Sequence, residues 1–359
     1  LTPTRTAPPE PAIAVLDEVA NMFIRARQPL LFVGRGAKDA APELIELAHR
    51  TGAVVASTLS GKGVYPETDP LWLWASLGPL SPPPMHAIAE TCDGALILGA
   101  RLSELGSAHF RARFPKNCFH VDIDPSVPNR SVASVPVVAD AATFVRALLR
   151  HIESHKRGLL PRDNDAPIRA LASAHRWVAD DLHARTGSRS EGALDPYRLI
   201  QTVQESLPTD TIFCTDSGNS TIHALEALRL ACPERFLCPA DYNSMGFSVP
   251  AALGAAWSNP SRTVVSFVGD GAFLMTGLKS LVGEPSAPPI LVIVLRDRRL
   301  GMIGDIQRVT HRAEVCTKLP EFHLEALRLR PSRLHFATVS TQAALAANLE
   351  DARRHLAAG

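Results

Sequence analysis

The chain has 359 residues, of which 46% are hydrophobic and 20% charged, and its 37 basic and 36 acidic side chains give a formal net charge of +1. This length fits about two globular domains, and the near-neutral charge provides no basic surface for nucleic acid or for an anionic membrane. Because the apolar runs are strand-sized, six to eight residues, no transmembrane helix is expected either.

The start of the chain and its cysteines indicate where the protein works. The Pro-rich residues 1–12 contain no apolar stretch of the kind found in signal peptides, so we predict a linker. None of the six cysteines belongs to a CxxC pair, which argues against a zinc site or a disulfide framework. Buried free thiols in a reducing compartment fit this pattern better, and we predict a cytoplasmic protein.

Strand-like and helix-like runs alternate along most of the chain, a pattern typical of parallel α/β domains. In the first block, residues 13–155, strands are predicted at "PLLFVG" (29–34), "AVVAS" (53–57), "GALILGA" (94–100), "CFHVDID" (118–124) and "PVVAD" (136–140). Helices are predicted over "APELIELAHRT", with Gly52 as the C-cap, and near 141–154. This block is expected to form one doubly wound domain.

Residues 156–194 contain one amphipathic helix between polar, turn-rich flanks and are predicted to connect two domains. The second block, residues 195–359, opens with Asp195 as a helix N-cap and Pro196 at the first helical position. Its strands are predicted at "TIFCTD" (211–216), "RFLCPA" (235–240), "TVVSFVGD" (263–270) and "PILVIVLRD" (289–297), with "LHFATV" (334–339) as a further candidate. The predicted fold class is therefore α/β, with two doubly wound parallel-sheet domains.

Two acids stand at the carboxyl ends of consecutive predicted strands in the second block. "TVVSFVGD" ends in Gly269-Asp270-Gly271, and "PILVIVLRD" ends in Asp297. Ligands of open parallel sheets bind beyond these ends, and neighbouring strands would bring both carboxylates to one edge. Two carboxylates beside a helix N-terminus suggest an Mg²⁺ ion that bridges to a diphosphate. Gly271 would let the backbone approach the phosphate closely.

A Gly-Asp-Gly triplet alone is weak evidence, since one arises by chance in roughly one chain of this length in ten. The simpler alternative is a tight strand-to-helix turn in which Asp270 caps the helix. The pairing of Asp270 with Asp297 at a second strand end makes the metal site the better interpretation.

Longer motifs surround these acids and extend into the first block. In the second block they are "GDGAFLMTG" followed by "VIVLRDRRLGMI", "LDPYRLIQTVQESLPTDTIFCTDSGNS" and "NSMGFSVPAALGAA". In the first block they are "PLLFVGRGA", "TLSGKGVYPETDPL" and "ILGARLSE". They resemble the middle and diphosphate-binding domains of thiamine diphosphate-dependent enzymes of the acetolactate synthase and pyruvate decarboxylase type, and along the chain they occur in that family's order. The likeness covers nearly all of residues 10–330.

The resemblance implies a role for each matching residue. Asp270 and Asp297 would bind Mg²⁺ through their side chains, and Arg299 would bind it through its backbone carbonyl. The residues implied for the cofactor's diphosphate are Asn219, Ser220, Gly269, Gly271 and Ala272.

The same resemblance assigns the rings of the cofactor to a second segment. The carbonyl of Asn243 would accept a hydrogen bond from the pyrimidine amino group, and Met245 would be the apolar wedge that bends the cofactor. An ordinary core methionine is the alternative for Met245. The bent cofactor would activate itself and then act as an electron sink for a small 2-oxo acid.

The glutamate that activates the cofactor in this family is expected on another polypeptide. It lies in an N-terminal pyrimidine-binding domain, and no glutamate of this chain has a similar context. The resemblance therefore implies no catalytic residue in this chain. It implies a separate pyrimidine-domain subunit instead, in a hetero-oligomer with two copies of each. A fragment of a longer chain of the same family is the alternative.

Some residues depart from the family's pattern and bear on specificity. The usual Asn-Asn pair is Arg296-Asp297 here, and aspartate is an equally hard oxygen ligand. In "RDRR", Arg298 or Arg299 would face an anionic substrate or a partner subunit, although a solvated loop is the simpler interpretation. Ile306 stands where acetolactate synthases carry a tryptophan that shapes the acceptor site, which argues against branched-chain amino-acid synthesis.

The first block offers weaker signals. "VGRGA" keeps only Gly34 and Gly36 of a dinucleotide-binding fingerprint. We expect this domain to hold no cofactor, with FAD, ADP or NAD as the alternatives. "SGKG" (60–63) lacks the other residues of a phosphate-binding loop. The histidines without a catalytic context are His86, His109 and His223.

The predicted function is that of the diphosphate- and Mg²⁺-binding subunit of a split 2-oxo acid decarboxylase or carboligase, a lyase or transferase. A non-catalytic homologue that binds the cofactor or serves as a scaffold is the alternative. The intact pair of Asp270 and Asp297 favours the enzyme.

Overall fold

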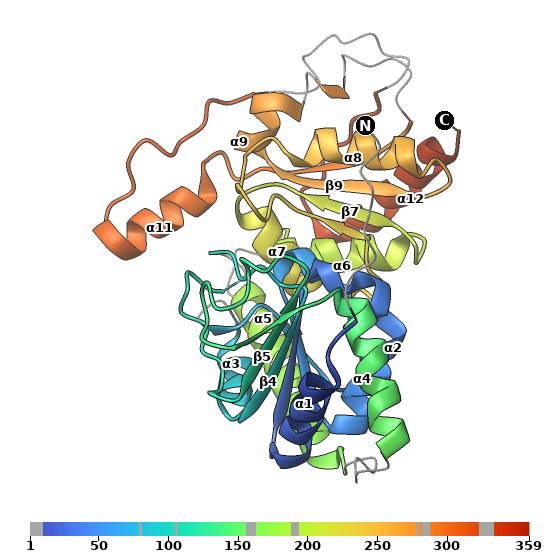
Figure 1. The fold of residues 1–359 in the computed structure, drawn as a ribbon. Coiled ribbons are helices and arrows are strands. Elements are labelled where there is room, and N and C mark those ends of the chain that lie inside the picture. The colour runs from blue at the N-terminus through green and yellow to red at the C-terminus, as the bar shows by residue number, and fades with distance from the viewer. Residues whose placement is uncertain are drawn as a thin grey trace. The chain divides into compact units, whose positions relative to one another are not determined.

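The computed structural model describes residues 10–78, 81–104, 107–155, 163–187, 194–277, 280–281, 288–322 and 334–358. The chain divides into two compact units (Figure 1). Unit 1 comprises Leu1–His183 and Arg229–Glu234, and unit 2 comprises Ala184–Leu228 and Arg235–Gly359. Each contains a parallel sheet, so the predicted fold class is confirmed. Residues 1–9 of the predicted linker lie outside the described residues.

Unit 1 is built around a six-stranded sheet with the strand order β3-β2-β1-β4-β5-β6. The strands are β1 (Pro29–Val33), β2 (Val54–Ser57), β3 (Trp72–Ala75), β4 (Gly94–Leu98), β5 (Cys118–Asp122) and β6 (Val135–Val138). All neighbours pair in parallel. Strands β1, β2, β4 and β5 are buried at every position, as expected for a parallel sheet covered on both faces. The strand order reverses between β1 and β4, where such sheets bind ligands.

Helices cover both faces of the sheet of unit 1 (Figure 1). On one face lie α1 (Ile13–Arg25), α2 (Ala41–Thr51) and α4 (Ala141–His155), and on the other lie α3 (Pro83–Glu90) and α5 (Asp165–Gly187). Helix α2 ends at Gly52, which has the left-handed φ of 67°. The predicted C-cap is therefore confirmed. Glycine suits this position because it adopts the left-handed conformation without a steric penalty.

A buried ion pair fastens the segment Arg229–Glu234 within unit 1. Lys62 Nζ and Glu67 Oε2 are 2.7 Å apart, and their side chains are 1% and 0% exposed. Glu67 Oε2 also accepts the N–H of Leu230 over 3.0 Å, and the Glu67 N–H donates to the Leu230 carbonyl over 2.8 Å. The "SGKG" lysine therefore has a structural partner, since a buried charge needs one.

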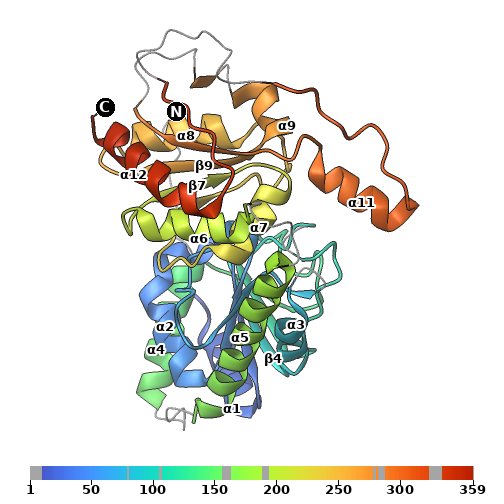
Figure 2. The same ribbon diagram turned by 180° about the vertical axis from the view of Figure 1, so that it is seen from behind.

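Unit 2 contains a four-stranded parallel sheet with the order β10-β9-β7-β8. The strands are β7 (Ile212–Thr215), β8 (Phe236–Leu237), β9 (Val264–Gly269) and β10 (Leu291–Leu295). Helix α8 (Ser248–Ser258) packs on one face, and its alanines contact β7 and β9 in the core. On the other face lie α6 (Pro196–Ser206), α7 (Asn219–Ala227) and α12 (Gln342–Ala358), as Figure 2 shows from behind. Helix α11 (Gly301–His311) projects away from this sheet in both views.

The predicted N-cap at Asp195 is confirmed. Asp195 precedes α6, and its side chain accepts the N–H of Tyr197 over 2.9 Å. This bond satisfies one of the donors that the first turn of a helix leaves without a partner. None of the described helices is both long enough and apolar enough to cross a bilayer.

Some expectations differ from the structure. Residues 334–339 form no strand, and the predicted strand 235–240 is reduced to β8. The helix after Gly-Asp-Gly is one α-helical turn, α9 (Asp270–Ala272), followed by a π-helical turn, η4 (Phe273–Gly277). π-Helical turns are rare in proteins, and those that occur are often found at functional sites. The prediction of buried thiols holds for Cys92, Cys118 and Cys214 and is wrong for Cys232 and Cys316, which are exposed.

Candidate functional site

The ends of β9 and β10 form one edge of the sheet of unit 2. The two strands pair in parallel, with Leu295 opposite Gly269. Asp270 and Asp297 therefore lie at neighbouring strand ends, as predicted. Asp270 is only 1% exposed, whereas the side chain of Asp297 is 49% exposed.

The Asp270 carboxylate ties the two strand ends together. Its Oδ1 accepts the N–H of Gly271 over 2.9 Å, and its Oδ2 accepts the N–H of Arg298 over 2.8 Å. Arg298 has a φ of 59°, a conformation that costs a non-glycine residue energy and is retained where the surroundings require it. Each carboxylate oxygen keeps a lone pair for a further partner.

The electrostatics of this edge fit a divalent cation. Burial raises the pKa of Asp270, and the nearby charge of Asp297 raises it further against the opposing effect of the N–H donors. A cation beside both carboxylates would relieve this cost. Among the described residues, no group of three or more His, Cys, Asp or Glu side chains is arranged to hold a metal ion by itself. Two carboxylates with room for water and phosphate are the ligand set that Mg²⁺ favours.

The loop after β10 is held by a short antiparallel bridge and by ion pairs. Leu300 N–H donates to the Thr317 carbonyl over 2.8 Å, and Leu319 N–H donates to the Arg298 carbonyl over 2.9 Å. These two bonds do not involve the carbonyl of Arg299, so its use as a metal ligand stays a prediction.

The arginines of this loop face carboxylates of their own unit. The Arg298 guanidinium lies 3.0 Å from Glu321. The Arg299 guanidinium lies 3.4 Å from Asp297, 3.1 Å from Asp305 and 3.4 Å from Glu314. These contacts favour the simpler interpretation of "RDRR", a loop paired within the protein.

The first residues of α7 reach the same edge. Asn219 Nδ2 donates to Asp305 Oδ2 over 3.0 Å. The hydrogen bond from Asn219 and the charges of Arg299 and Arg308 outweigh the effect of burial, so the pKa of Asp305 is lowered. Ser220 is buried, and its hydroxyl donates to the Asp216 carbonyl over 3.1 Å. For Ser220, the backbone N–H is thus the group left to face a diphosphate.

Gly301 shows how closely these groups approach. A Cβ at this position would lie 2.6 Å from Asp297 Oδ2 and 3.1 Å from Asn219 Nδ2. The predicted metal ligand and the predicted diphosphate ligand therefore lie side by side at the start of α11. Only glycine leaves them this space.

A buried carboxylate anchors the segment that carries Met245. Asp216, at the end of β7, is 0% exposed. It accepts the N–H of Gly246 over 2.8 Å and the N–H of Ser248 over 2.7 Å. The Gly246 carbonyl accepts the hydroxyl of Thr276 over 2.8 Å. The turn is thus fixed on both sides, to β7 and to η4.

Met245 lies over the Gly-Asp-Gly turn. Its Cε is 3.5 Å from the position of a Cβ on Gly271. The side chain also packs against the core cluster of Val249, Val268, Ala272 and Phe273. Met245 therefore has both the place predicted for a cofactor wedge and the contacts of a core residue. Asn243 is exposed and has a positive φ of 49°.

The sequence reasoning assigned no role to Asp216, Gly301 or Asp305. Asp216 stands at a strand end like Asp270, and that position was the available signal. No sequence signal marked Asp305 or Gly301, because their contacts with Asn219 join residues that are 86 and 82 positions apart in the chain.

The glycines of unit 1 serve packing at the carboxyl edge of its sheet. The Gly36 N–H donates to the Gly99 carbonyl over 3.0 Å. A Cβ on Gly34 would lie 2.2 Å from the Gly99 oxygen, and one on Gly36 would lie 2.9 Å from the Gly99 Cα. Two loops therefore touch at the point where dinucleotides bind in related folds. Whether this domain takes FAD stays a prediction.

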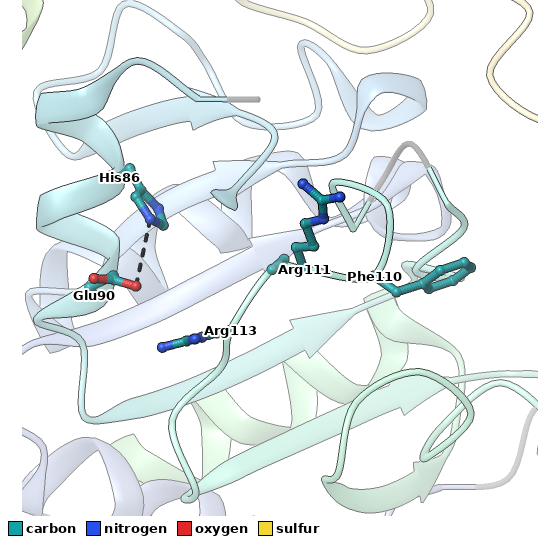
Figure 3. Close-up of a pocket in the computed structure, with 6 residues that line it drawn as sticks. His86, Glu90, Phe110, Arg111 and Arg113 are labelled. Carbon is teal, nitrogen blue, oxygen red and sulfur yellow. Dashed lines mark ion pairs between the residues drawn. The ribbon is translucent and has the colours of Figure 1, made fainter. Parts of the chain in front are cut away.

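A hollow of about 530 Å³ lies elsewhere in unit 1 (Figure 3) and is lined by His86, Glu90 and residues 110–113. His86 Nε2 is 3.6 Å from Glu90 Oε1 on the same helix, and the Phe110 ring points away from both. His109 pairs with Glu104 over 2.9 Å, and the His223 ring packs on Tyr197 at 4.7 Å. All three histidines flagged in the sequence thus have structural neighbours.

Known proteins match both parts of the chain. Residues 16–148 match the family model of the central domain of thiamine pyrophosphate enzymes. Residues 216–358 match the model of their C-terminal domain, which binds thiamine pyrophosphate. No family model of a pyrimidine-binding domain matches the chain.

Curated relatives agree with these models. A probable acetolactate synthase 2 of Oryza sativa subsp. japonica is 30% identical over 298 residues, which are 82% of this chain and 44% of the relative. A probable acetolactate synthase large subunit of Methanocaldococcus jannaschii is 26% identical over 304 residues, 82% of this chain and 50% of the relative. Acetolactate synthase 1 of Zea mays is 29% identical over 304 residues, 82% and 46% of the two chains. The chain spans about half the length of these relatives.

Proposed function

Because the chain belongs to the thiamine pyrophosphate enzymes and carries their central and C-terminal domains, we propose that it binds thiamine diphosphate with Mg²⁺ in the decarboxylation or carboligation of a small 2-oxo acid. The observation that carries this proposal is the pair Asp270 and Asp297 at the ends of two paired strands. Under this proposal, the chain is part of a lyase or transferase related to acetolactate synthases.

Each element of unit 2 would have a defined task. Asp270 and Asp297 hold the metal, and the backbone of Gly271 and the start of α7 face the diphosphate. Met245, fixed by the bonds of Asp216 to its turn, orients the rings. The bound cofactor would supply the electron sink that a 2-oxo acid needs when it loses carbon dioxide.

The activating glutamate is assigned to a pyrimidine-binding domain outside these residues. We favour a separate subunit, in a hetero-oligomer with two copies of each chain; a longer form of this chain is the alternative. Helix α11 supports such a contact, because Ile303, Ile306 and Val309 stand three residues apart and are 47%, 53% and 85% exposed. The relatives' greater length matches an additional domain of this kind.

Calorimetry of the whole chain with thiamine diphosphate tests the first part. We expect saturable binding in Mg²⁺ that disappears in EDTA, and no binding of thiamine, which lacks the diphosphate. Binding that does not depend on the metal, or no binding, would overturn the metal site and favour a scaffold.

Mixing the chain with a pyrimidine-domain protein of the same family tests the second part. We expect consumption of a 2-oxo acid such as pyruvate only in the mixture. Cofactor binding without turnover in any pairing would contradict the catalytic proposal while leaving the cofactor site intact.

A further inference from the structure

Asp305 connects three elements of unit 2. It lies in α11, 86 residues from Asn219, whose side-chain amide donates to Asp305 Oδ2 over 3.0 Å. Asp305 Oδ1 accepts from Arg299 over 3.1 Å and also from Arg308. One carboxylate thus joins the start of α7, the loop after β10 and α11.

The bond to Asp305 fixes the direction of the Asn219 amide. An asparagine amide can turn over and exchange its donor for its acceptor. A carboxylate accepts only, so Asp305 selects the orientation with the Nδ2 group toward α11 and the carbonyl oxygen away from it. Asp297 Oδ2 approaches the same amide across Gly301. The orientation of Asn219 is therefore set beside an expected metal ligand.

Asp305 also shares the guanidinium of Arg299 with Asp297. Of the three carboxylates around this guanidinium, Asp305 is the nearest, at 3.1 Å, and Asp297 lies at 3.4 Å. Without Asp305, the positive charge would fall more fully on Asp297. A guanidinium held against Asp297 opposes the binding of a second cation there, because like charges repel.

We propose that Asp305 is a positioning residue of the diphosphate and metal site, which orients the Asn219 amide and draws Arg299 away from Asp297. The inference rests on the proposed function, since these residues would serve a cofactor. It also links the placement of α11 to cofactor binding, because the carboxylate that orients Asn219 belongs to that helix.

Two variants separate the two effects. Asp305→Ala removes both, and should raise the Kd of thiamine diphosphate and the Mg²⁺ concentration for half-maximal binding by about tenfold each, the size expected for one charge-assisted hydrogen bond. Asp305→Asn keeps an acceptor for Asn219 but loses the charge that faces Arg299. It should restore the cofactor Kd to within about threefold of the wild type while the Mg²⁺ requirement stays high.

The matched control is Asp351→Ala in α12 of the same unit. Asp351 also pairs with an arginine on its own helix, Arg354, over 3.0 Å. Helix α12 lies at the opposite end of unit 2 from α9 in both views (Figures 1 and 2). Both titrations are measured by calorimetry on the whole chain, with melting temperatures recorded in parallel. Wild-type binding by Asp305→Ala, or an equal loss in Asp351→Ala, would overturn the positioning role.

A cofactor-independent readout separates this inference from the proposed function. The side-chain amide signal of Asn219 in ¹⁵N NMR spectra should shift in Asp305→Ala and not in Asp351→Ala. An unshifted signal overturns the contact itself. If the Asn219 signal shifts in Asp305→Ala but the wild type binds no thiamine diphosphate in Mg²⁺, the proposed function fails, and the positioning role toward a cofactor fails with it.

Discussion

The two sheets use glycine at their carboxyl edges in opposite ways. In unit 1, a Cβ on Gly34 would lie 2.2 Å from the Gly99 oxygen, so two loops fill the edge. In unit 2, a Cβ on Gly269 or on Gly218 would meet nothing within 4 Å. Open space remains there beside a buried acid. Glycine at a strand end therefore indicates a ligand site only where the surrounding backbone leaves the space open.

The acids at the two edges differ in the same sense. Asp122, at the end of β5, is 7% exposed and accepts the N–H of Asp124 over 3.0 Å. It completes a turn. Burial raises the pKa of Asp270, and the charge of the neighbouring Asp297 raises it further. A carboxylate whose charge is disfavoured by its surroundings is a candidate for cation binding, and one that caps a turn is explained without a ligand.

The largest expected effect concerns the proposed metal site. Asp270→Asn should weaken Mg²⁺-dependent binding of thiamine diphosphate by about a thousandfold, or about 4 kcal/mol, because it removes a buried charged partner of the cation. Calorimetry at fixed Mg²⁺ measures the change. Asp122→Asn, the matched substitution in unit 1, should leave the affinity unchanged, and a comparable loss there would contradict the difference between the edges.

The second effect is on stability and depends on the space around each glycine. Gly34→Ala should lower the free energy of unfolding by about 3 kcal/mol, because the new methyl group meets backbone that cannot move aside. Gly269→Ala should change it by less than about 0.5 kcal/mol. Urea denaturation measures both. Equal stabilities of the two variants would show that the glycines of unit 1 are not needed for packing.

Gly269→Ala should nevertheless weaken cofactor binding, since its methyl group enters the space beside Asp270. Gly34→Ala should leave binding by its folded fraction unchanged. The two substitutions are therefore expected to have opposite profiles, one affecting stability and the other affinity. Calorimetry on the folded variants checks this.

The smallest effect is a dependence on pH that concerns unit 1. Burial lowers the pKa of His175, whose ring also bonds the Trp72 carbonyl over 2.9 Å. The unfolded chain then takes up a proton at a higher pH than the folded one, so stability falls as the pH falls below about 6.5. We expect a loss of about 1 kcal/mol between pH 7.5 and 5.5.

Tryptophan fluorescence during urea denaturation can follow this loss, because three of the four tryptophans, at positions 72, 74 and 177, belong to unit 1. His175→Gln keeps a donor for the Trp72 carbonyl and should flatten the pH dependence. An unchanged slope in this variant would assign the effect to another group, of which His120 is the first candidate because burial lowers its pKa as well.

Much of the fold could be predicted because it follows from local pattern. Runs such as "GALIL" and "TVVSFV" are apolar over the length of one strand, and parallel pairing places their ends together. Strand β3 (Trp72–Ala75) was not predicted, although β2 and β7 are equally short. The π-helical turn was not predicted either, and within it the Phe273 ring lies close against Gly277.

In the candidate site, too, some residues could be predicted from the local sequence pattern and others could not. Asp270 and Asp297 could be found from the sequence because each stands at the end of a recognisable strand. Asp216 and Asp305 act on residues 30 and 86 positions away, so their roles depend on tertiary contacts. The sequence alone therefore shows these two acids but not the residues that they contact.

The return of Arg229–Glu234 to unit 1 limits how the protein can be dissected. Expression of residues 1–183 by themselves would remove Leu230, the partner of buried Glu67, and would uncover an ion pair adapted to a dry interior. The cofactor-binding half is likewise interrupted by a segment that belongs to its neighbour. Chimeras that exchange one unit between relatives should therefore transfer this six-residue segment with unit 1, to which it belongs, although it lies within the sequence of unit 2.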